Sequence, residues 1–99
     1  MYLTIVGLTP VPEFADRHID AQVLIDVLWA VAGPGRRVEH ISARTGPRHL
    51  DVGVYSSADS QDDADRNAHE LVERAAATVP LLRGWAVRPP PADRSADGA

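Results

Sequence analysis

Residues 37–55 alternate between apolar and polar side chains, which is the period of a β-strand. The turn Thr45-Gly46-Pro47-Arg48 predicts that this stretch folds back on itself as one β-hairpin. The predicted pairs are Arg44 with His49, Ala43 with Leu50, Ser42 with Asp51, Ile41 with Val52 and His40 with Gly53. One face is apolar, with Ile41, Ala43, Leu50, Val52 and Val54, and the other is polar, with His40, Ser42, Arg44, His49, Asp51 and Tyr55. The hairpin therefore predicts a sheet that helices cover on one side and that is open on the other.

Residues 2–8 predict another strand, because they are mostly β-branched or large apolar residues and Thr9-Pro10-Val11-Pro12 ends the run. Both faces of this strand are apolar, as expected for a central strand. If Leu3 and Ile5 face the helices together with Ile41 and Val52, the open face gains an apolar centre. That centre would be formed by Tyr2, Val6, Val38 and Tyr55.

A first helix is predicted over residues 16–32, with Asp16 as its N-cap and Gly33-Pro34-Gly35 as its end. Its apolar positions cover far more than the arc of about 100° that a helix on a sheet needs. Only Gln22 and Asp26 mark a clearly polar stripe. We therefore expect that something besides its own sheet covers part of this helix.

A second helix is predicted from the capping sequence Ser60-Gln61-Asp62-Asp63 to Thr78, just before Pro80. The acidic residues of its first turn favour a helix N-terminus electrostatically. Its apolar residues form one narrow stripe, which is typical of a surface helix that packs closely on a sheet.

A short last strand is predicted over residues 84–88, and residues 89–99 are predicted to be a disordered, Pro-rich tail. The order β-α-β-β-α-β over a single domain, residues 1–88, predicts an α+β fold of the ferredoxin-like sandwich type. Right-handed crossovers would give an antiparallel four-stranded sheet of order 4-1-3-2, with both helices on one face.

The chain has 99 residues, a formal net charge of −4 and no cysteine. The absence of cysteine excludes disulfides, thiolate metal sites and thiol nucleophiles. The acidic balance disfavours general nucleic-acid binding, which needs a basic face. No apolar run is long enough to cross a membrane, and no basic region precedes the apolar N-terminus, so we expect neither a membrane span nor a signal peptide. By default, these features predict a cytoplasmic protein.

Three residues of the polar hairpin face suggest chemistry, because Ser42 would oppose Asp51 and His40 would lie diagonally from that carboxylate. A Ser, His and Asp together suggest a hydrolase, but the sequence has no nucleophile elbow, so cross-strand hydrogen bonding is favoured over catalysis. His40 and His49 would stand roughly 13 Å apart along the strands, too far to share a metal ion.

Two further motifs do not indicate a metal site or a phosphate-binding loop. His69 and Glu73 share a helix face but lack a second His and a third ligand, so a surface ion pair is favoured over a metal site. The segment Gly33-Pro34-Gly35-Arg36-Arg37 follows a helix, whereas phosphate-binding loops precede one. No metal or cofactor is predicted.

An open sheet face with an apolar centre and a polar rim predicts a contact surface. The favoured hypothesis is a non-enzymatic interaction module, accessory or regulatory, that acts through this face and self-associates as a homodimer. Its predicted binding residues are Tyr2, His40, Ser42, Arg44, His49, Asp51 and Tyr55. The alternative is a small cofactor-independent oxygenase or isomerase of the dimeric α+β barrel type, with His40, Asp51 or His18 as its base. That enzyme would need an apolar cavity of at least ~300 Å³ between sheet and helices.

Overall fold

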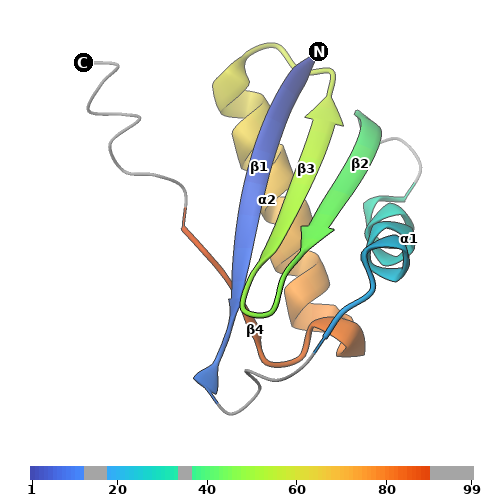
Figure 1. The fold of residues 1–99 in the computed structure, drawn as a ribbon. Helices are drawn as coiled ribbons and strands as arrows, with labels where there is room; N and C mark the ends of the chain where they lie inside the picture. The colour runs from blue at the N-terminus through green and yellow to red at the C-terminus, as the bar shows by residue number, and fades with distance from the viewer. Residues whose placement is uncertain (13–17, 34–36, 90–99) are drawn as a thin grey trace.

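The computed structural model describes residues 1–12, 18–33 and 37–89 of the chain (Figure 1). Its elements, in order, are β1 (Tyr2–Pro10), α1 (Ala21–Ala32), β2 (Val38–Thr45), β3 (Leu50–Ser56), α2 (Gln61–Thr78), the 3-10 turn η2 (Pro80–Leu82) and β4 (Trp85–Val87). The predicted N-cap Asp16, the predicted stop at Pro34-Gly35 and residues 90–99 of the predicted tail lie outside the described residues.

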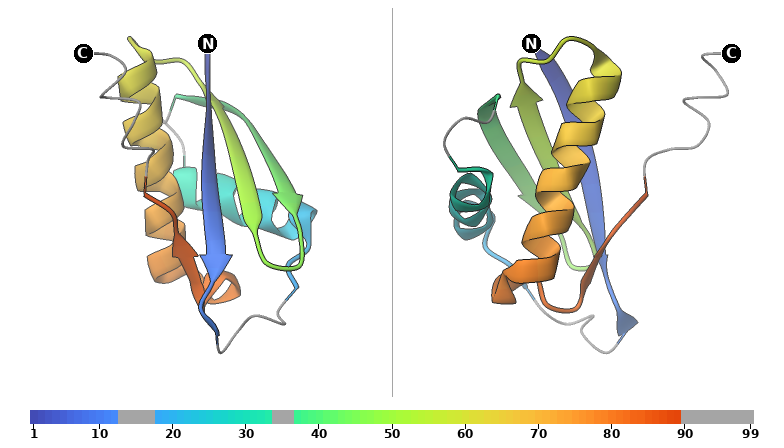
Figure 2. Two further views of the ribbon diagram at one scale, coloured as in Figure 1. Left: turned by 60° about the vertical axis from the view of Figure 1, so that its left-hand side comes forward. Right: turned by 180° about the vertical axis from the view of Figure 1, so that it is seen from behind.

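The four strands form one antiparallel sheet in the order β2-β3-β1-β4. Helix α2 packs along β1 and α1 packs against β2, both on the same side of the sheet, and no helix of the described residues lies on the other side (Figure 2). The core fills the space between the two layers. The predicted coarse class, an α+β domain with a four-stranded antiparallel sheet and two helices, is confirmed.

The helices do not occupy the places that the ferredoxin-like arrangement gives them. Helix α2 runs along the strands, whereas α1 is seen almost end-on beside β2 in the same view (Figure 1). Helix α1 therefore lies across the strand direction, beside the β2 edge of the sheet. Its apolar surface is wider than the part of the sheet that it covers.

The inward face of β1 is the reverse of the expected one. Val6 and Leu8 are completely buried, whereas Leu3 is 41% and Ile5 is 56% exposed on the open side of the sheet. Because both faces of β1 are apolar, periodicity alone could not decide between them. The pairs Val6 with Val52 and Leu8 with Leu50 place β1 in line with the apolar face of the hairpin.

The hairpin keeps its predicted faces but has a different register. Each residue of β2 from His40 to Arg44 pairs two residues further along β3 than predicted, so that Arg44 faces Asp51 and His40 faces Tyr55. A shift by two residues leaves every side chain on its original face. The reason lies in the turn, where Gly46 N donates to His49 O over 2.9 Å. Pro47 is then the first central residue, which proline favours, instead of the second, which it disfavours.

A bulge near the start of β2 turns one more residue inward. The register shifts between Val38 and His40, and Val38 pairs with the buried Ser56 and packs against the core. The extra residue, Glu39, breaks the alternation. Val38 therefore does not lie on the open face, contrary to the expectation from strict alternation.

The observed start of α2 agrees with the prediction, whereas the observed start of α1 does not. Helix α2 begins after Ser60, whose Oγ accepts a hydrogen bond of 3.1 Å from Asp63 N, as the capping sequence predicts. Helix α1 begins at Ala21 and its N-cap is Asp20, four residues later than the predicted N-cap Asp16. The Asp20 carboxylate accepts 3.0 Å from Val23 N, so the local capping contact sets the true start.

Helix α1 is left with exposed apolar side chains, as its wide apolar arc predicts. Leu24, Leu28 and Ala32 are buried, whereas Val23 is 46% and Trp29 is 40% exposed. Among the described residues, no helix has both the length and the apolar character needed to span a membrane.

Candidate binding face on the open side of the sheet

The residues on the open side of the sheet form three rows that run across the strands. The aromatic row is Leu3, Tyr55 and His40, the middle row is Ile5, Gly53 and Ser42, and the charged row is Gly7, Asp51 and Arg44. Each row takes one residue from β1, one from β3 and one from β2. The side chains of a row are neighbours because directly opposed residues of antiparallel strands lie close together. We call these nine residues the open face.

The aromatic row forms one end of the open face. The rings of His40 and Tyr55 face each other across β2 and β3, with centroids 5.6 Å apart and planes tilted by 52°. Such tilted geometry is favourable for aromatic pairs. Leu3 stands on the other side of Tyr55, so this end of the face is largely apolar.

The middle row has a glycine as its floor. A Cβ atom added to Gly53 would lie 2.6 Å from Ser42 Oγ and 3.5 Å from the Cδ1 atoms of both Ile5 and Leu3. The neighbouring side chains therefore close over the glycine backbone from both sides. Glycine inside a strand often marks such a close approach. The result is an apolar centre in which the Ile5 side chain is 56% exposed.

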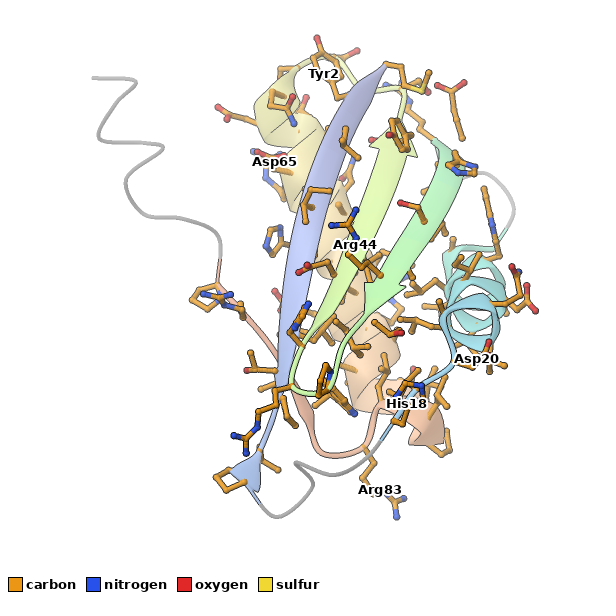
Figure 3. The ribbon with its side chains drawn as sticks, viewed as in Figure 1. Tyr2, His18, Asp20, Arg44, Asp65 and Arg83 are labelled. Carbon is orange, nitrogen blue, oxygen red and sulfur yellow. The ribbon has the colours of Figure 1, made fainter. Side chains whose placement is uncertain are left out.

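The charged row forms the other end of the open face. Arg88, just past β4, extends this row, because its N–H donates over 2.8 Å to Gly7 O. A Cβ atom at Gly7 would lie 3.2 Å from Arg88 Cδ and 3.5 Å from Asp51 Oδ1, so the arginine stem and the carboxylate both lie close over this glycine. Figure 3 shows the Arg44 side chain in front of the sheet, over β3. This end of the open face therefore carries two guanidinium groups around one carboxylate.

The structure brings together most of the predicted binding residues. His40, Ser42, Arg44, Asp51 and Tyr55 share the open face. His49 lies just beyond the charged row, where its Nε2 is 4.0 Å from Asp51 Oδ2, an ion pair only when the imidazole is protonated. Tyr2, predicted on this face, pairs with Ser56 and by alternation lies on the helix side with Thr4 and Val6.

The cluster expected for a hydrolase is not assembled. Ser42 faces Gly53 instead of Asp51, because Arg44 occupies the position opposite that carboxylate. His40 stands two rows away from Asp51, roughly 13 Å along the strands. The preference for a non-catalytic polar face follows from this register.

The metal sites considered from the sequence find no support in the described residues. His49 faces Gly46, six residues along β2 from His40, so the two imidazoles are separated by roughly 20 Å, more than expected. His69 Nδ1 lies 3.0 Å from the Asp65 carbonyl oxygen of its own helix. Across residues 1–12, 18–33 and 37–89, no group of three His, Cys, Asp or Glu side chains could hold a metal ion.

The sequence interpretation missed five residues of this surface. Leu3, Ile5, Gly7, Gly53 and Arg88 complete it, and none was predicted to lie there. The two glycines gave a usable signal, since glycine within a strand indicates a close approach. Leu3 and Ile5 gave no such signal, because both faces of β1 are apolar.

The candidate bases of the enzyme hypothesis lie outside the space between sheet and helices. His40 and Asp51 are on the open face, and His18 is exposed just before α1 (Figure 3). Among the described residues, the only buried polar side chains are Thr4 and Ser56. Neither is an acid or base at ordinary pH.

No protein-family model, no curated protein and no solved structure shows significant similarity to this chain.

Proposed function

We propose that this protein is a non-enzymatic interaction module that acts through its open face, and that a second copy of the chain is its partner there. The observation that carries the proposal is the exposure of Leu3 and Ile5, 41% and 56%, at the centre of a sheet face that no described helix covers. Fully burying a large apolar side chain contributes about 1.5–3 kcal/mol, so covering these half-exposed side chains contributes roughly half of that each. Polar and charged side chains surround this centre, as at protein interfaces.

The arrangement of the rows supports self-association. Two packed sheets keep their strand directions within about 30° of each other. A two-fold axis along the middle row would therefore bring the aromatic row of one copy over the charged row of the other. Leu3 would lie over Gly7 of the second copy, where the aliphatic stem of Arg88 covers the glycine. Tyr55 would lie over Asp51 of the second copy as a hydrogen-bond donor. Ile5 would meet its own counterpart on the axis.

The binding module is better supported than the enzyme hypothesis. An enzyme of the dimeric barrel type needs a titratable group inside an apolar cavity. The buried side chains between the sheet and the helices are apolar apart from Thr4 and Ser56, within the part of the chain that the structure describes. The exposed apolar centre is on the opposite side, where it favours binding.

Sedimentation velocity over a range of protein concentrations tests the proposal. Ser42→Arg places a charge in the middle row, where it would meet the same charge of the second copy on the axis, and Val23→Arg places the same charge on an exposed apolar position of α1. We expect the wild type and Val23→Arg to dimerise and Ser42→Arg to stay monomeric, with circular dichroism showing all three folded. A monomeric wild type, or a Ser42→Arg chain that dimerises like the wild type, would refute self-association through the open face.

A further inference from the structure

The outer edge of β1 is only partly paired. β1 spans nine residues, but β4 pairs only with Leu8, Thr9 and Pro10. One more bond, from Arg88 N to Gly7 O, extends this contact before Pro89 follows. From Leu3 to Gly7 no strand of the described chain lies beside β1 on this side.

Two bonds show which backbone groups point to this edge. Gly7 O accepts from Arg88 N over 2.8 Å, and Leu3 O accepts from Gln61 Nε2 over 3.2 Å. The N–H and C=O of one strand residue point the same way, and those of the next residue point the opposite way. The N–H groups of Leu3, Ile5 and Gly7 and the C=O of Ile5 therefore point outward. None of these four groups bonds to another described residue.

The other long edge of the sheet is better protected. β2 carries the bulge at Glu39 and lies beside α1 (Figure 1). Bulges, charges and covering helices are common ways to prevent pairing at an edge. Between Tyr2 and Thr9, β1 has no charged residue, no proline and no bulge. Its free edge is flanked on the open face by the exposed side chains of Leu3 and Ile5.

On the helix side, this edge is bordered by an acidic stripe of α2. Thr4 Oγ1 donates over 2.7 Å to Asp65 Oδ1, and Figure 3 shows Asp65 beside β1 on the side away from β3. Asp62, His69 and Glu73 follow the same side of the helix, three or four residues apart. Asp62 and Glu73 are exposed. We call Asp62, Asp65 and Glu73 the acidic stripe.

We propose that the edge of β1 from Leu3 to Val6, up to the point where Arg88 lies beside Gly7, binds an extended segment of a partner protein as an added strand, with alternating apolar and basic side chains. Main-chain hydrogen bonds supply affinity in this mode, and alternate side chains supply specificity. The apolar side chains lie beside Leu3 and Ile5 on the open face. The basic side chains point to the other side, towards the acidic stripe.

The numbers of hydrogen-bond donors and free acceptors at this edge favour an extended partner segment over a second copy of β1. Before Gly7, which Arg88 covers, the edge offers two N–H donors, those of Leu3 and Ile5, but only one carbonyl without a partner, because Leu3 O already accepts a bond. Two identical edges would bring together more donors than free acceptors, and a buried donor without a partner costs stability. An extended partner segment directs the carbonyl of every second residue to this edge, and none of these carbonyls has accepted a bond beforehand. This edge is separate from the contact in the proposed function, which uses the open face.

Amide hydrogen exchange and peptide titration by NMR test this inference on the full chain. The probe is a blocked seven-residue peptide that alternates Val and Arg, and the matched control peptide alternates Val and Glu. Ile5→Pro removes one outward N–H without touching the β1–β3 ladder, and proline is tolerated on an edge of this kind. Ile5→Val keeps the N–H and serves as its control. Glu73→Arg reverses one charge of the acidic stripe on an exposed helix position.

We expect the Val-Arg peptide to slow exchange of the Leu3 and Ile5 amides. Ile5→Pro should weaken its binding about tenfold or more, Glu73→Arg should weaken it less, and Ile5→Val should leave it unchanged. Binding of the Val-Glu peptide at equal strength would refute the role of the acidic stripe. Equal binding by Ile5→Pro, or protection of these amides by the protein's own second copy without peptide, would overturn the inference.

The two proposals can fail separately. Ser42→Arg should abolish the face-to-face dimer and still bind the Val-Arg peptide, because β2 lies away from the β1 edge. A wild type that binds the peptide but stays monomeric would refute the proposed dimer alone. A wild type that dimerises, but whose β1 edge amides exchange equally fast with and without the peptide, would refute the edge site alone.

Discussion

Thr4 donates a hydrogen bond of 2.7 Å from its Oγ1 to Oδ1 of Asp65, 61 residues further along the chain. Thr4 is only 5% exposed, and Gln61 Nε2 donates to the same carboxylate oxygen over 2.8 Å. This contact joins β1 to the second turn of α2. The bond gives Thr4, a polar residue on the inward face of β1, a hydrogen-bond partner. The Thr4 hydroxyl can therefore be buried without being left unpaired.

Thr4→Val should lower the free energy of unfolding by about 1–3 kcal/mol, because it removes a hydrogen bond to a carboxylate while keeping nearly the same shape. Urea denaturation monitored by circular dichroism measures the change. Thr45→Val, at a half-buried position at the end of β2, is the matched control and should shift the midpoint much less. Equal losses in the two variants would contradict a specific role for the Thr4–Asp65 bond.

Leu28→Ala should cost about 2–5 kcal/mol, because this α1 side chain is fully buried and its loss leaves a cavity between the helix and the sheet. Val23→Ala, on the same helix, removes a side chain that is 46% exposed and should cost far less. Thermal unfolding of the two variants side by side gives the comparison. A large loss for Val23→Ala would indicate that another surface covers α1 in solution.

Ser60→Ala should destabilise the protein by about 1 kcal/mol, since Asp63 N loses its side-chain acceptor at the start of α2. Ser57→Ala changes an exposed serine just after β3 and should be close to neutral. The urea midpoints of both variants provide the test. If the two serines behaved alike, the Ser60 cap would not contribute to stability.

The turn of the hairpin can be tested by exchanging two neighbouring residues. The double variant P47R/R48P keeps the composition but moves proline to the second central position, where it is disfavoured. We expect it to lose more stability than Pro47→Ala, which should cost about 0.4–1 kcal/mol by freeing the unfolded chain. Urea denaturation ranks the variants, and NMR contacts between the His40 and Tyr55 rings report the register. If P47R/R48P were more stable than Pro47→Ala, the result would contradict the observed position of Pro47 in the turn.

Several features could be predicted from local sequence because their causes are local. The polar and apolar faces of the hairpin follow from side-chain alternation and survive a register shift of two residues. Helix α2 follows from its Ser60 cap, its single apolar stripe and Pro80 just beyond its end. Much of the candidate binding face was found for the same reason, since His40, Arg44 and Tyr55 alternate with buried neighbours.

The remaining features have causes that lie far away in the chain. Both faces of β1 are apolar, so its inward face was decided by pairing with β3 and by the Thr4–Asp65 contact, neither of which the local pattern encodes. The start of α1 depended on which of two aspartates caps it, and either aspartate is compatible with an N-cap by local sequence alone.

The two unlike faces of the hairpin, the helix from the Ser60 cap to Thr78 and the surplus apolar surface of α1 could all be inferred from the amino-acid sequence. The outward position of Leu3 and Ile5, the pairing of Arg44 with Asp51 and the unpaired part of the β1 edge became known from the folded chain. This difference arises because alternation and capping act over a few residues. A choice between two apolar faces is made by the packed neighbours, which come from distant parts of the chain.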